Sequence, residues 1–320
     1  MMQKKSIWAV LFVMLLMALS VNGAVAEDDV LRSGDYRYRV LEDGTAEITW
    51  YPGNDEILNI PGTLGGKKVT SIGDKAFAAS GALIITIPDG VKKIGKMAFA
   101  GCEATEITMP DTVTSIGDSA FAECFYLEHI TLSNNLVSIG RTPFLWSTSL
   151  ESITIPDSVT YMEGNPFMVS GDPWINIKVS PEHPTFAVID DVVFNKVERS
   201  VISYPNKKIM DVYEIPQVIA TIKNGTESED ITLTTIGEAA FIGCCTMNII
   251  IPEGVTRIER SAFAMTNFLD ITIPESVTYI ADDAFEDSYC VTLIVPRDSY
   301  AEQYAKEQNL NYTYSDGVAE

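Results

Sequence analysis

The residues that most often perform catalysis or bind metals are scarce in this chain. Only two histidines occur among 320 residues, His129 and His183, and neither has another histidine at metal-ligand spacing. Structural zinc sites use four cysteine or histidine ligands, and a nucleophile needs a neighbouring base. The chain contains no HExxH, GxSxG, phosphate-loop or calcium-loop pattern. These observations predict a protein that is not an enzyme and that uses no metal and no cofactor.

The five cysteines are the second group that could do chemistry. Three of them, Cys102, Cys124 and Cys244, each follow a phenylalanine by three residues, where other copies of the pattern carry serine or threonine. A position shared by these residue types requires a small side chain, so we expect core thiols and no essential disulfide. A bridge between Cys102 and Cys124 is the alternative, because neighbouring strands lie ~4.8 Å apart.

The charge of the chain restricts the class of partner. Forty-four acidic residues against 22 lysines and arginines give a formal net charge of -22. Nucleic acids and anionic membranes are bound through basic surfaces, so neither is expected as a partner. Hydrophobic residues make up 46% of the chain, which indicates a folded protein with a sizeable core. Acid pairs such as Asp190-Asp191 are expected to be solvated charges.

Residues 1–26 have the three parts of a secretory signal peptide. Lys4 and Lys5 precede an apolar run from Ile7 to Leu19, and the small residues of Ala24-Val25-Ala26 form a cleavage site before Glu27. The run is short for a bilayer core of ~30 Å, so we expect no membrane insertion after cleavage. The signal predicts a protein that is secreted or associated non-covalently with the cell surface.

A repeat determines the architecture that holds these residues. Eight phenylalanines recur at spacings of 22 or 23 residues within two blocks, at Phe77, Phe99, Phe121, Phe144, Phe167, Phe241, Phe263 and Phe285. Each unit combines a strand-like alternation with a segment that fits a short helical turn. One unit cannot bury its own apolar side, whereas stacked units bury a continuous core. The pattern predicts a leucine-rich-repeat solenoid, with a parallel β-sheet on one face and helical turns or loops on the other.

The repeated unit I-P-x-x-V-T-x-I-G-x-x-A-F-x-x-C resembles the BspA-type leucine-rich repeat of bacterial surface and secreted proteins. The resemblance extends from about Ile57 to Pro296. It implies a non-enzymatic extracellular protein that functions in binding or adhesion, and it implies no particular ligand.

Irregular stretches divide the chain further. Tyr36–Val40 and Ala46–Trp50 flank Glu42-Asp43-Gly44, which predicts a β-hairpin that caps the solenoid. Residues 223–230 (KNGTESED) are polar, and we expect them to form a surface loop. The predicted organisation is a signal peptide at 1–26, a β cap at 27–56, repeats at 57–179, an irregular β-hairpin module at 180–214, repeats at 215–296 with an insertion at about 223–234, and a cap helix and tail at 297–320.

The cap helix is expected from Ser299 to Gln308, with Tyr300, Tyr304 and Ala301 facing inward.

The exposed side chains of the strands are the main candidates for binding. One outward column is rich in threonine and the column beside it is varied and polar. The repetition of threonine favours a structural explanation of that column, β-propensity and same-face packing, and a weakly polar binding strip is the alternative. Across the first block of repeats the candidate residues are Glu106, Thr108, His129, Thr131, Ser152, Thr154, Asn176 and Lys178.

Trp146 is a ninth candidate, because it stands where other units have small or polar residues, beside Phe125 and Tyr126. An exposed aromatic group would mark a partner site, whereas packing under the turn at Pro143 would explain it structurally. The main hypothesis is an exported monomer that binds a protein or glycan surface. The alternative is a cell-surface or assembly scaffold without a specific host ligand.

Overall fold

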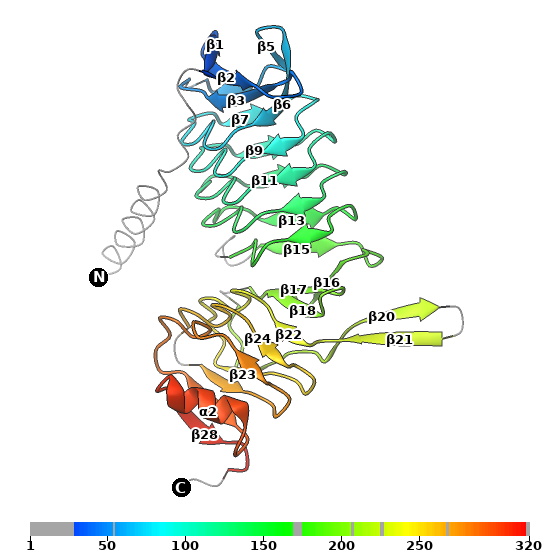
Figure 1. Ribbon diagram of the computed structural model, residues 1–320, viewed down its shortest axis with the longest axis vertical. Coiled ribbons are helices and arrows are strands. Elements are labelled where there is room, and N and C mark those ends of the chain that lie inside the picture. Colours follow the sequence, from blue (N-terminus) through cyan, green and yellow to red (C-terminus); the bar gives the residue numbers. More distant parts are fainter. Residues whose placement is uncertain are drawn as a thin grey trace.

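The protein is described by a computed structural model covering residues 29–53, 55–168, 175–205, 208–224, 227–266 and 269–317. The chain winds into a parallel β-solenoid of about 11 turns, with an N-terminal hairpin at one end and a helix at the other (Figure 1). The predicted solenoid is confirmed. The signal peptide and its cleavage site lie outside the described residues.

The first block of repeats forms a six-stranded parallel sheet. Its strands are in the order β15 (Asn176–Val179), β13 (Ser152–Ile155), β11 (His129–Thr131), β9 (Glu106–Thr108), β7 (Ile84–Thr86) and β4 (Ile57–Asn59). Most of these strands bury only their central residue, such as Ile107 or Ile130, between two exposed ones. This alternation is the period of two that the sequence shows.

The opposite side of these repeats carries a second sheet that the sequence did not reveal. Its path is β1 (Leu31–Ser33), β2 (Tyr36–Val40), β3 (Ala46–Trp50), β6 (Lys67–Ile72), β8 (Lys93–Ile94), β10 (Ser115–Ile116), β12 (Ser138–Ile139) and β14 (Tyr161–Met162), with β5 (Thr63–Leu64) paired to β6.

Tight turns, rather than the predicted helical turns, follow the short strands of this second sheet. In one unit Met97 and Gly101, two residues either side of Phe99, have φ of 55° and 69°. Positive φ cannot continue a right-handed helix. The turns instead bond to one another along the solenoid, as where the Phe99 amide donates to the Ala120 carbonyl at 2.8 Å.

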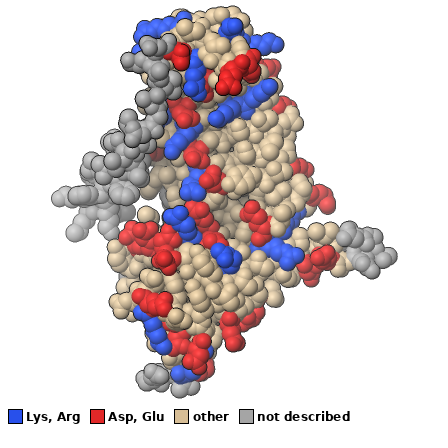
Figure 2. All heavy atoms as spheres, in the orientation of Figure 1, with Lys and Arg blue, Asp and Glu red and all other residues tan. Residues whose placement is uncertain are grey.

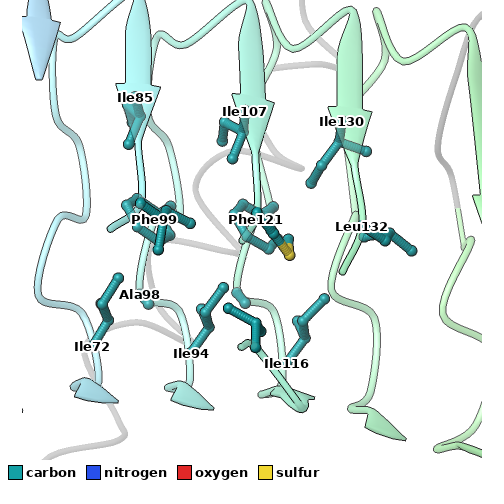
Figure 3. Packing of buried hydrophobic residues seen from close by; sticks show 14 of the residues in the cluster. Ile72, Ile85, Ile94, Ala98, Phe99, Ile107, Ile116, Phe121, Ile130 and Leu132 are labelled. Carbon is teal, nitrogen blue, oxygen red and sulfur yellow. The ribbon is translucent and has the colours of Figure 1, made fainter. Parts of the chain in front are cut away.

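The repeated phenylalanines stack along the axis of the solenoid. In the first block, successive ring centroids from Phe77 to Phe167 lie 5.2, 5.4, 5.9 and 6.2 Å apart, with planes within 11° of parallel. Isoleucines from both sheets surround the rings, for example Ile107 and Ile116 beside Phe121 (Figure 3). The core is therefore one continuous column within this block.

The second block repeats the arrangement with two further sheets. One is ordered β16 (Phe186–Ile189), β17 (Val192–Asn195), β18 (Ser200–Ser203), β22 (Thr235–Ile236), β24 (Arg257–Ile258) and β26 (Tyr279–Ile280). The other is ordered β19 (Tyr213–Glu214), β23 (Asn248–Ile250), β25 (Asp270–Thr272), β27 (Thr292–Val295) and β28 (Asn311–Tyr314).

Strands β16 to β18 form the predicted hairpin module and separate two hydrophobic cores. Val193 and Ile202 belong to the core of the first block, whereas Val192, Phe194 and Val201 belong to that of the second. Successive side chains of a strand point to opposite faces, so the module packs against the first core on one face and against the second core on the other. The turn at Asp190-Asp191 has positive φ at both residues, 50° and 66°, as a type I′ hairpin requires.

The inserted segment and the C-terminal region differ in part from the expectations. The expected surface loop lies in a two-stranded antiparallel ribbon, β20 (Val218–Asn224) and β21 (Glu227–Thr232), which we call the arm (Figure 1). The cap helix α2 (Tyr300–Glu307) is confirmed, but Tyr300 is 40% exposed, and Ala305 is buried with Ala301 and Tyr304. The expected C-terminal tail contains β28, which pairs with β27.

Candidate functional site

The strand face of the first block, meaning the exposed side chains of β4 to β15, forms two columns in register. One column runs Ile57, Ile84, Glu106, His129, Ser152 and Asn176, and the other runs Asn59, Thr86, Thr108, Thr131, Thr154 and Lys178. All twelve side chains are exposed except that of Ser152, which is half-buried. Eight of the nine candidate residues therefore share one surface.

Sequence reasoning missed the apolar end of this surface. Ile57 is 57% exposed and Ile84 is 45% exposed, and they continue the column of Glu106 and His129 towards the N-terminus. The same alignment of repeats places them in this column, so the signal was present in the sequence. The strand face is thus apolar at one end, weakly polar in the middle and cationic at Lys178.

Trp146 is not part of the strand face. It lies in the turn between β12 and β13, with φ of 62° and a half-buried side chain. Its position matches that of Glu123 in the preceding unit, where burial raises the pKa of the carboxyl. The structure therefore separates this candidate from the other eight.

The second histidine has a structural role. His183 is fully buried, its Nδ1 accepts from the amides of Thr185 and Phe186 at 3.1 Å, and its Nε2 lies 3.0 Å from the Pro156 carbonyl. Two accepted hydrogen bonds at Nδ1 place the proton on Nε2, so the ring is neutral. Burial lowers its pKa below the usual value. The ring therefore ties the hairpin module to the last repeat of the first block.

The cysteines lie where the small-residue column predicted. Cys102 and Cys124 are buried free thiols with their sulfur atoms 3.3 Å apart. The hydrogen bond between them lowers the pKa of Cys102 and, with burial, raises that of Cys124. Burial also raises the pKa of Cys244 to about 11. High pKa values keep Cys124 and Cys244 protonated and unreactive at neutral pH.

The described residues provide neither a metal centre nor a membrane-spanning helix. They contain no group of three or more histidine, cysteine, aspartate or glutamate side chains placed to hold a metal ion. They also contain no helix with the length and apolar character needed to cross a membrane.

The geometry defines a class of protein, the leucine-rich-repeat solenoids, in which stacked units present a wide and shallow sheet surface. A family model described as "BspA type Leucine rich repeat region" matches residues 60–179 and 220–310 in six copies. The chain therefore belongs to the BspA-type leucine-rich-repeat family, as its repeated unit indicated.

Solved structures with a similar fold come from several bacteria. The pneumococcal vaccine antigen PcpA is 18% identical with a TM-score of 0.57, over 89% of this chain and 98% of that one. A leucine-rich-repeat protein from Eubacterium ventriosum is 22% identical with a TM-score of 0.56, over 83% and 71%. One from Bacteroides ovatus is 23% identical with a TM-score of 0.54, over 90% and 77%. No functionally curated protein matches the chain.

Proposed function

We propose that this chain is an exported, non-enzymatic binding or adhesion protein that recognises a protein or glycan surface through its strand face. The observation that carries the proposal is the strand face itself, with exposed side chains aligned in two columns along six parallel strands. Such a surface is wide and shallow, which suits recognition of another macromolecule by many modest contacts. Membership of a family of repeat proteins supports a binding role.

The charge of the protein favours basic partners. A net charge of -22 slows association with acidic molecules and speeds association with basic ones. Acidic and basic side chains are interspersed over the face of the molecule drawn in Figure 2, with no extended basic patch. We therefore propose a partner surface rich in lysine and arginine, and location of the protein outside the cell or on its surface.

The test is a binding screen with matched variants. Residues 27–320 are incubated at low salt with immobilised basic extracellular matrix proteins, with basic and neutral glycans, and with the cell wall of the producing organism. For any hit, His129→Ala with Thr131→Ala should weaken binding at least ten-fold. The control Lys93→Ala lies on β8 of the opposite sheet and should leave affinity unchanged.

Two outcomes would contradict the proposal. Unchanged affinity of the double variant would place binding elsewhere on the molecule. Binding to the producer's own cell wall alone would identify a surface scaffold instead of a receptor for another organism's molecules.

A further inference from the structure

The parallel sheet of the first block ends at β15 without a neighbouring strand on its outer side. β15 pairs with β13, and among the described residues no strand pairs with its other edge. The Asn176 amide donates to the Glu151 carbonyl at 3.0 Å, so the backbone groups of Asn176 and Lys178 face β13. Alternate residues of a parallel strand face opposite neighbours, so those of Ile177 and Val179 face outward.

In interior repeats, the corresponding strand edge is hydrogen-bonded to the next strand. Met109 stands at the same position of its strand as Val179, and its amide donates to the Thr131 carbonyl of the next strand at 3.0 Å. In the second block, Ile215, Ile251 and Ile273 donate to the next strand in the same way. The outer edge of β15 is therefore shaped to hydrogen-bond one more parallel strand.

A groove lies where that strand would be. Its cavity volume is about 800 Å³, and it is bounded by Ile177 to Val179 of β15, by β16, and by the base of the arm. Ile219 and Ile231 of the arm are buried, while Ile222 is 46% exposed and lines the groove. Figure 1 shows the arm projecting from the body next to this break between the two blocks. The groove thus combines a free strand edge with an apolar wall.

The charge of the groove is opposite to that of the protein as a whole. Lys178 and Lys196 line it with one acid, Glu182. Lys178 is exposed on the last strand of the sheet, and among the residues that the structure describes no acidic side chain forms an ion pair with it. On an added strand, the residue directly beside Lys178 would bind best if it carried a carboxylate, because opposite charges on adjacent strands attract each other.

We propose that this groove binds an extended peptide segment of a partner protein, which adds to β15 as a parallel strand and places an acidic residue beside Lys178. The free amides and carbonyls of β15 require a peptide backbone, because they are repeated at the spacing of a strand. The apolar side chains that line the groove would contact every second side chain of the bound peptide. This site is separate from the centre of the strand face and does not depend on the function proposed for it.

The test uses the intact mature chain and short peptides with blocked ends. The probe copies residues 150–156 with glutamate in place of Thr154, because Thr154 aligns with Lys178 in the register of the sheet. A second peptide carries lysine at that position, and a third is the glutamate peptide N-methylated at the residues matching Ser152 and Thr154. Affinity is measured by isothermal titration calorimetry at low salt.

We expect the glutamate peptide to bind at least ten-fold more tightly than the lysine peptide and the N-methylated peptide not to bind. Lys178→Glu should reverse the charge preference, whereas Lys93→Glu on the opposite sheet should leave it unchanged. His129→Ala should have no effect, which distinguishes this site from the strand face. Circular dichroism confirms that each variant is folded.

Three results would overturn the proposal. The first is no binding of the glutamate peptide at millimolar concentration. The second is equal binding of the N-methylated peptide, which would indicate apolar adhesion without strand pairing. The third is a dimer in sedimentation that Val179→Pro dissociates, which would show that a second copy of this chain occupies the edge.

Discussion

Truncation of one stacked ring tests whether the phenylalanine column holds the solenoid together. The ring of Phe121 is fully buried between those of Phe99 and Phe144, at centroid distances of 5.4 and 5.9 Å. Phe121→Ala removes the ring and leaves a cavity that rigid neighbouring turns cannot fill. Burial and cavity terms for such a change sum to about 3–5 kcal/mol of unfolding free energy. That range of unfolding free energy already includes the loss of the stacking contacts with the two neighbouring rings.

The assay is urea unfolding followed by circular dichroism, with a control in the same repeat. Phe125 is 45% exposed, so Phe125→Ala should change the unfolding free energy by less than about 0.5 kcal/mol. Phe121→Leu keeps most of the volume and should cost less than the alanine variant. A loss below about 1 kcal/mol for Phe121→Ala, or an equal loss for Phe125→Ala, would refute the argument that the column dominates the core.

Three further predictions concern the ends and the polar core. Burial lowers the pKa of His183 in the folded protein, so as pH falls below about 6.5 the unfolded chain takes up a proton before the folded protein does. The free energy of unfolding of the wild-type protein should therefore decrease between pH 7 and 5. His183→Gln cannot take up this proton, so the difference in unfolding free energy between this variant and the wild type should become smaller over the same range. Ser299→Ala removes the N-cap that accepts from the Glu302 amide and should cost about 1 kcal/mol in thermal denaturation. Melting curves with and without reductant should coincide, because Cys102 and Cys124 are free thiols; a large drop on reduction would contradict this.

The features that sequence predicted best are those that one repeat shares with the next. The phenylalanine spacing gives the period of the solenoid, and equal spacing sets the register of the strands, as the pairing of Glu106 with His129 shows. The N-terminal hairpin was predictable for a different reason. Asp43-Gly44 lies between two alternating runs, and glycine there adopts the φ of 80° that the turn requires.

The second sheet could not be predicted from local patterns. Its strands β8, β10, β12 and β14 have two residues each, such as Ser115 and Ile116, and two residues define no periodicity. Their extended conformation comes from parallel pairing with the short strands of the neighbouring repeats. The arm resembles a loop in sequence for a similar reason, because its tip is polar and its strands are stabilised mainly by pairing with each other.

The candidate site was predictable only where it repeats. Alignment of the units brought eight of the nine candidates to one surface, but it did not reveal the groove beside β15. That groove depends on the absence of a neighbouring strand, which no residue of β15 encodes. The hairpin module follows β15, and its strands β16 to β18 pair with one another and with β22 in a separate sheet, so none of them extends the strand-face sheet.

A perfectly regular solenoid cannot position a partner along its axis. A ladder such as Thr108, Thr131 and Thr154 presents the same side chain at every ~4.8 Å step, so a ligand that fits one register fits the next almost equally well. A single bound register requires residues that occur once. On this surface they include His129 near the centre and Lys178 beside the free edge, while the exposed isoleucines Ile57 and Ile84 occur only at the other end. Selectivity should therefore reside in these departures from the repeat, while the threonine ladder supplies contact area that any extended partner can use.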